Sequence, residues 1–179
     1  MSFGPFSSGA VLLIIVFQSL FVGIPFVTFI SWGEEFGWRS YLQIRLLSHH
    51  PLLAAIATGL ILGIWHYPLI LMGYERFENV FVGLVTFPAN TILLAIIFGW
   101  LRRKTGSIWS ASMAHAATND LGALLINNLF LGGPHFLFVS YVGVLAWIPL
   151  GAVCAWIILA RQLMSATGAH GTAAGIFSA

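Results

Sequence analysis

Charged residues are scarce in this sequence, and their scarcity excludes most classes of protein. The 179 residues include seven Lys/Arg and five Asp/Glu, so that 7% of the chain is charged. Soluble domains usually have about 25%. Hydrophobic residues make up 59%, and the mean hydropathy is +0.96. These values exclude a soluble globular domain, a disordered chain and a coiled coil, and they leave a polytopic membrane protein.

Cysteine and net charge are also low. The single cysteine, Cys154, cannot form an intrachain disulfide, so a disulfide scaffold is excluded. The net charge is +2, and the only basic run is Arg102, Arg103 and Lys104, which gives no support for nucleic-acid binding. We therefore expect the lipid bilayer, and not a nucleic acid, to surround this chain.

The sequence contains five long stretches of apolar residues, which we call windows. Each is long enough to cross ~30 Å of hydrocarbon as a helix. The windows are continuous rather than alternating, which excludes a transmembrane β-barrel, and backbone pairing in lipid then requires helices. The sequence therefore predicts an all-α, polytopic membrane helix bundle with about five transmembrane helices. The windows are 10–32, 51–72, 79–101, 107–131 and 136–160.

The distribution of positive charge predicts the orientation. Six Lys/Arg follow the first, third and fifth windows, and only Arg76 lies on the opposite side. The positive-inside rule then places the N-terminus outside and the C-terminus in the cytoplasm of a multi-pass protein, in the cell (plasma) membrane. We expect one membrane domain over 1–160 and a flexible cytoplasmic tail over 161–179. The six residues are Arg39, Arg45, Arg102, Arg103, Lys104 and Arg161.

Two adjacent carboxylates, Glu34 and Glu35, abut the first apolar window. Ionisable groups in membrane spans are costly and usually functional. Glu35 and Arg39 are four residues apart, so they share a helical face and can form an ion pair, whereas Glu34 points about 100° away. One carboxylate would then be neutralised while the other could act as a general base. A charged cap at an interfacial helix end is the structural alternative.

Polar residues interrupt two other windows. His66 lies between Trp65 and Tyr67 in the second window. Instead of a catalytic residue, it could be a core histidine with its hydrogen bonds made, or part of an aromatic belt at the membrane interface. His115 and Asn119 are four residues apart in the fourth window and share a face, which would also suit a hydrogen-bonded pair that holds helices together.

Together these groups predict a hydrolytic site inside the membrane. A glutamate and a histidine can activate water, either as a general base or by binding a metal. A second histidine with an asparagine can stabilise an oxyanion. To form one site, the polar groups of the three windows must lie at the same depth in the membrane. We therefore expect the first helix to continue to about Leu47, with a break or strong tilt near Pro25 or Gly33. The other histidines, at positions 49, 50, 135 and 170, are expected in solvated or interfacial places.

In order and spacing, three segments resemble the motifs of the CAAX-processing and bacteriocin-processing (CPBP) intramembrane proteases, which include the type II CAAX prenyl endopeptidases. The segments are Glu34-Glu35-Phe36-Gly37-Trp38-Arg39, Leu62-Gly63-Ile64-Trp65-His66 and His115-Ala116-Ala117-Thr118-Asn119, and the resemblance covers about 31–120. One residue departs from the family pattern. The family usually has Phe four residues before the second-motif histidine, where this chain has Leu62, and we expect that position to be one of packing rather than chemistry.

The resemblance implies an intramembrane endopeptidase that hydrolyses a peptide bond of a membrane-associated protein or peptide. Glu34 and His66 would activate the water, and His115 and Asn119 would stabilise the oxyanion. The ion pair of Glu35 with Arg39 would support them.

Three alternatives remain open. Zinc held by Glu34, His66 and His115 would make the protein a metalloendopeptidase. We favour metal-free activation, because the chain has no His-Glu-x-x-His motif and its polar groups come from separate helices. The other two alternatives are a non-catalytic membrane scaffold or immunity protein and a proton-coupled transporter subunit, which would also use buried Glu and His.

Overall fold

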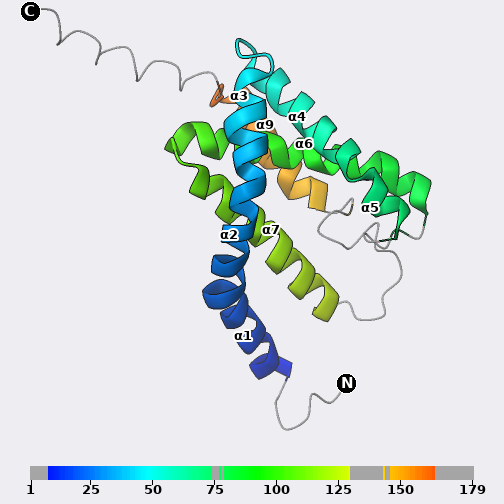
Figure 1. The fold of residues 1–179 in the computed structure, drawn as a ribbon. Coiled ribbons are helices and arrows are strands. Elements are labelled where there is room, and N and C mark those ends of the chain that lie inside the picture. Colours follow the sequence, from blue (N-terminus) through cyan, green and yellow to red (C-terminus); the bar gives the residue numbers. More distant parts are fainter. Residues whose placement is uncertain (1–7, 74–76, 78, 130–142, 144–145, 164–179) are drawn as a thin grey trace, which may run out of the picture.

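The structure is a computed structural model that describes residues 8–73, 77, 79–129, 143 and 146–163 (Figure 1). Every regular element among these residues is a helix, which confirms the all-α prediction. The elements are α1 (Ser8–Gln18), η1 (Ser19–Gly23), α2 (Ile24–Glu35), η2 (Phe36–Leu42), α3 (Gln43–Arg45), α4 (Pro51–Trp65), α5 (Tyr67–Leu71), α6 (Val80–Thr105), α7 (Ile108–Leu129) and α9 (Trp147–Leu159).

The lengths of these helices agree with a membrane bundle. Three helical stretches are long and apolar enough to cross a bilayer, namely Gly9–Arg45, Pro51–Leu71 and Val80–Thr105, and Trp147–Leu159 is a shorter apolar helix. α7 fills the fourth expected window, and α9 is the described part of the fifth. The expected tail falls almost entirely outside the described residues, and so do His135 and His170. His49 and His50 are exposed, as expected.

The first helix runs without interruption from α1 to α3, so the prediction of a break near Pro25 or Gly33 is wrong. Two π-helical segments, η1 and η2, occur instead. η1 ends just before Pro25, whose nitrogen cannot donate a hydrogen bond, so a local change in the hydrogen-bond pattern takes the place of a break. The extension of the helix toward Leu47 is confirmed, because it reaches Arg45. A strong tilt of this helix in the bilayer stays a prediction.

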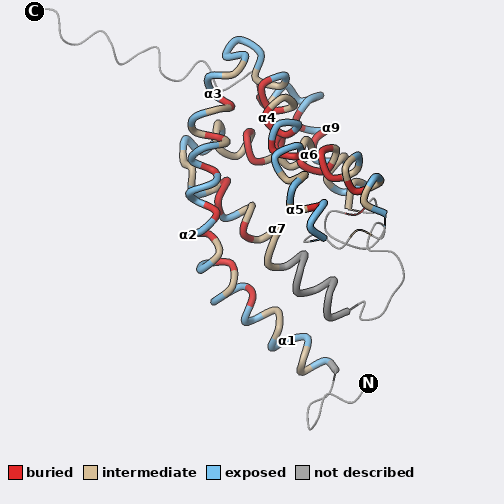
Figure 2. Tube along the Cα trace, turned by 45° about the vertical axis from the view of Figure 1, so that its right-hand side comes forward, coloured by how far each residue is buried: buried red, intermediate tan, exposed pale blue. Residues whose placement is uncertain are grey.

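α4 and α6 pack closely, and Figure 2 shows buried residues gathering where they meet. Two glycines of α4 permit this approach. A Cβ added to Gly59 would lie 2.5 Å from the Cα of Ile92, and one added to Gly63 would lie 2.5 Å from the Cα of Pro88. The Thr91 hydroxyl also donates to the Gly59 carbonyl oxygen at 2.8 Å. α9 packs against α6 and the start of α4 in one buried cluster, and its Cys154 thiol donates to the Leu93 carbonyl oxygen of α6 at 3.3 Å.

The contact of α4 with α6 predicts a difference between two glycines. Gly59→Ala should lower the free energy of unfolding by about 1–3 kcal/mol, because the new methyl group meets backbone that cannot move alone. Gly151→Ala, in α9, is the matched control. It adds the same atom where nothing lies within 4 Å, and it should be neutral or stabilising. Thermal unfolding in detergent measures both, and equal effects of the two substitutions would contradict the close packing.

Candidate active site

A buried ion pair lies where α2 passes into η2. The Glu35 and Arg39 side chains are 0% and 1% exposed, and an Arg39 Nη1 hydrogen donates to Glu35 Oε1 at 2.9 Å. The pair is the one expected from the four-residue spacing. Glu35 Oε1 also accepts a hydrogen bond from His115 Nδ1 of α7 at 2.8 Å. The carboxylate therefore joins two helices that are 80 residues apart in the sequence.

This contact assigns a hydrogen to the Nδ1 atom of the His115 ring. A carboxylate oxygen can only accept, so Nδ1 must be the nitrogen that carries hydrogen. Nε2 then lies on the far side of the ring from Glu35. It accepts a hydrogen bond when the ring is neutral and donates one when the ring is charged.

Phe98 of α6 packs against the same group of residues. Its ring is stacked with the His115 ring, with centroids 5.7 Å apart and planes 23° apart, and the Arg39 Cζ lies 5.1 Å from the Phe98 centroid. Phe98 is buried, and it restricts how both side chains can turn. Nothing in the sequence singles out Phe98, because one phenylalanine in a helix full of apolar residues carries no signal of its own.

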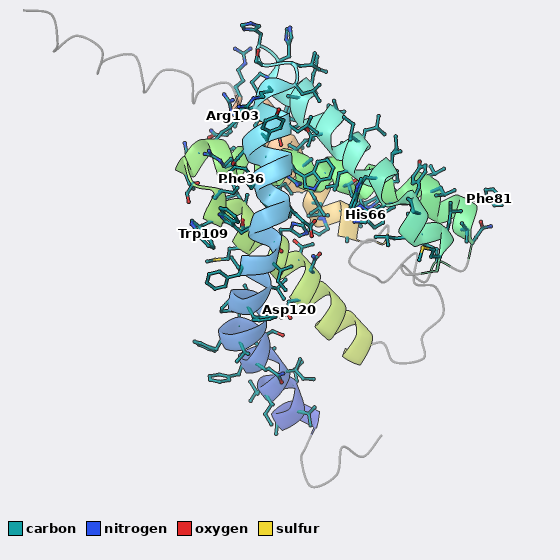
Figure 3. All side chains as sticks on the ribbon, in the orientation of Figure 1. Phe36, His66, Phe81, Arg103, Trp109 and Asp120 are labelled. Atoms are coloured by element: carbon teal, nitrogen blue, oxygen red, sulfur yellow. The ribbon has the colours of Figure 1, made fainter. Side chains whose placement is uncertain are left out.

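His66 lies at the junction of α4 and α5, to one side of the long first helix in Figure 3. Pro68 follows two residues later and cannot donate a backbone hydrogen bond, which accounts for the turn at this point. His66 Nδ1 lies 2.9 Å from the Leu62 carbonyl oxygen. Because a carbonyl only accepts, Nδ1 carries the hydrogen and Nε2 of the neutral ring has a free lone pair.

Aromatic rings enclose His66. The Trp65 and Phe87 centroids lie 4.9 and 4.8 Å from the His66 centroid. The side chain of Leu62 is buried, in agreement with the packing role expected for the residue that departs from the family pattern. The His66 ring is thus held at Nδ1 and partly shielded on its faces, which leaves Nε2 as its available nitrogen.

Glu34 has a different environment from Glu35. It is exposed, and no hydrogen bond joins it to another described side chain. One turn further along the helix, the ring centroid of Trp38 lies 6.1 Å from that of Trp65, the residue before His66. Side chains four residues apart lie on the same face of a helix. Glu34 is therefore on the face of the first helix that is directed toward the end of α4, although the structure does not bring Glu34 and His66 into contact.

Asn119 follows His115 by one turn on α7, so the two side chains share a face as the spacing predicted. Asn119 is half-buried, and its side chain makes no hydrogen bond within the described part of the chain. The structure thus joins Glu35, Arg39 and His115 directly, and it leaves Glu34 and Asn119 with unused hydrogen-bonding groups.

Among the described residues, no group of three or more His, Cys, Asp or Glu is close enough to hold an ion. As placed here, Glu34, His66 and His115 therefore do not converge as a three-ligand zinc site requires. The hydrogen bonds at Nδ1 of both histidines leave each Nε2 atom available, and neither hydrogen bond bears on whether a metal binds.

The buried pair predicts a strong coupling in stability. Arg39→Met should lower the free energy of unfolding by about 3–5 kcal/mol, because it leaves the Glu35 carboxylate buried beside a single partner. The double variant with Glu35→Leu should recover part of this loss, since no buried charge is left. Unfolding of the wild type, both single variants and the double variant measures the coupling. Additive losses would show that the two charges do not depend on each other.

The sequence over residues 9–121 matches the family described as type II CAAX prenyl endopeptidase Rce1-like. No curated protein matches the chain, and no solved structure does. The matched region contains the long first helix, α4, α6 and the part of α7 that carries His115 and Asn119. Because the match covers more than half of the sequence, the chain belongs to the type II CAAX prenyl endopeptidase Rce1-like family, which implies a membrane-embedded CAAX-type peptide hydrolase.

Proposed function

We propose that this protein is an intramembrane endopeptidase that hydrolyses a peptide bond of a membrane-associated protein or peptide. The observation that carries the proposal is the Glu35 carboxylate, which is fully buried between helices and hydrogen-bonded to both Arg39 and His115. A bundle that only needed stability would gain little from such a group, because apolar residues of similar volume usually stabilise as well or better. The arrangement is useful when it holds a histidine for chemistry.

Glu34 and His66 are the residues proposed to activate water. Glu34 is exposed, so its carboxylate can reach a water molecule, and the His66 Nε2 lone pair can accept a second hydrogen bond from the same water. One of the two takes the proton as the water oxygen attacks the substrate carbonyl carbon. The proton then passes to the nitrogen of the leaving amine as the peptide bond breaks.

His115 and Asn119 are proposed to bind the oxyanion that forms on the carbonyl oxygen. The Asn119 amide donates hydrogen bonds in any state, whereas His115 Nε2 donates only when the ring is charged. Glu35 supplies the opposite charge for that form at 2.8 Å. Glu35 and Arg39 are therefore positioning residues, because they act on the substrate only through His115.

The substrate is proposed to reach the site from the lipid, because the helices that surround the site are apolar on their outer faces. This favours a peptide that is itself held at the membrane. The protein would be a multi-pass protein of the cell membrane, with its N-terminus outside and its C-terminus in the cytoplasm.

Substitutions at the four proposed catalytic residues test the function. Glu34→Gln, His66→Ala, His115→Ala and Asn119→Ala should each lower kcat/KM on a membrane-associated peptide library by about 10²–10⁴-fold, the usual contribution of an acid–base group or an oxyanion donor. His49→Ala, an exposed histidine in the turn before α4, is the control and should retain full activity.

The same set separates the proposal from a non-catalytic scaffold. Glu34→Gln replaces an exposed group with one of the same shape, so the folded state and the unfolding midpoint should stay unchanged. Cleavage that persists in all four variants, or that the wild type lacks on every peptide, would leave only a binding role for the protein.

Metal-free activation predicts that a chelator has no effect. Purified enzyme treated with a strong chelator and then dialysed should cleave the peptide at the same rate, because Glu34 and His66 supply the base themselves. The rate with and without added zinc is the measurement. Activity that falls with the chelator and returns with zinc would show that a metal activates the water instead.

A further inference from the structure

A small cationic pocket lies beside Arg39, near the start of α4, whereas His66 lies at the other end of that helix. It lies between α3, the start of α4 and the last turns of α6, with a volume of about 20 Å³. Figure 3 shows Arg103 on the α3 side of the molecule. The side chains that matter for its chemistry are Arg39, Gln43, Arg102 and Arg103, which line it together with Gly99.

The charge of this pocket is unbalanced. Three arginines line it and no acidic residue does, although Glu35, behind the lining, balances the charge of Arg39. Arg39 is only 1% exposed and uses Nη1 for Glu35, while its Nε and Nη2 make no hydrogen bond to the described residues. The Nε of Arg103 is also buried and unpaired within the same described set. Buried guanidinium hydrogens need an acceptor, and the positive charge of Arg102 and Arg103 favours an acceptor that carries negative charge.

The size of the pocket limits what can enter. A volume of about 20 Å³ accommodates one oxygen-sized group. The Gln43 side chain lies against Gly99 so closely that a Cβ there would overlap its amide. An anion can therefore place one oxygen inside, between the guanidinium groups, while the rest of the molecule remains at the mouth.

The surroundings of the mouth favour a lipid. The pocket lies at the ends of apolar helices, where Arg102 and Arg103 occupy the last turn of α6. Ile44 and Leu47 border it and are 46% and 47% exposed, so an apolar chain can lie beside the cationic group. Basic pockets between membrane helices are typical binding sites for anionic headgroups.

We propose that this pocket binds the headgroup phosphate of an anionic phospholipid, with one phosphate oxygen between Arg39 and Arg103. The lipid would hold the Arg39 guanidinium on the side opposite Glu35. The headgroup site would therefore contact the same arginine that positions His115. Binding itself does not require the proteolytic function, so it can be tested separately.

Native mass spectrometry of the purified full chain tests the proposal, with phosphatidylglycerol compared with zwitterionic phosphatidylcholine. The wild type should bind phosphatidylglycerol preferentially, and Arg103→Gln should weaken that binding about fivefold, the usual effect of one basic residue at a membrane surface. Lys104→Gln is the matched control. It removes the same charge from the neighbouring exposed residue, which does not line the pocket, and it should bind like the wild type.

A second variant leaves every charge in place. Gly99→Ala adds a methyl group that overlaps Gln43, so it should also weaken phosphatidylglycerol binding, and it covers the case in which Arg103→Gln fails to fold. If Lys104→Gln and Arg103→Gln weaken phosphatidylglycerol binding equally, the lipid responds to surface charge in general and not to the pocket, and the proposal is overturned. Displacement of the lipid by an equal concentration of inorganic phosphate would overturn the lipid assignment and make the pocket a site for small anions.

Discussion

The buried Glu35 carboxylate is the constraint on which the rest of the site depends. A charge in a bundle surrounded by lipid is tolerated only when nearby groups compensate it. Arg39 on the same helix and His115 on α7 provide that compensation through a single oxygen. This requirement fixes the distance between the first helix and α7, the direction of the His115 ring, and, through Phe98, the position of α6 beside them. The Glu35 carboxylate and the groups around it therefore connect three helices through specific contacts.

The two adjacent glutamates show how one helix supplies two different environments. Successive residues differ by about 100° around a helix axis, so Glu35 is directed between the helices while Glu34 stays exposed. A buried carboxylate that accepts two hydrogen bonds at one oxygen is held in place, and that oxygen is not available to a substrate. An exposed carboxylate keeps its oxygens available for water. The proposed division of roles, with Glu35 positioning His115 and Glu34 transferring a proton, rests on this difference in burial.

Much of this arrangement could be predicted from the sequence, because a few polar residues in long apolar windows carry strong signals. The helices, the pairing of Glu35 with Arg39, and the extension of the first helix beyond Trp32 all follow from spacing. The π-helical segments could not be predicted, since Pro25 indicates lost hydrogen bonds but not how the helix absorbs the loss. Phe98 and the contact of Gln43 with Gly99 depend on how distant helices align, which no local pattern records.

Arg39 connects the two polar regions of the bundle, and its chemistry explains why an arginine is suited to this place. A guanidinium has donors on several sides of a rigid plane, so it can bond Glu35 with one nitrogen and keep two others available. A lysine would carry the same charge but not the same fixed fork, and it has no planar group to place 5.1 Å from the Phe98 centroid. Under the two proposals above, a lipid phosphate in the cationic pocket would contact the guanidinium that also holds the Glu35 oxygen bonded to His115. Arg39 would then link the headgroup site to the proposed oxyanion site.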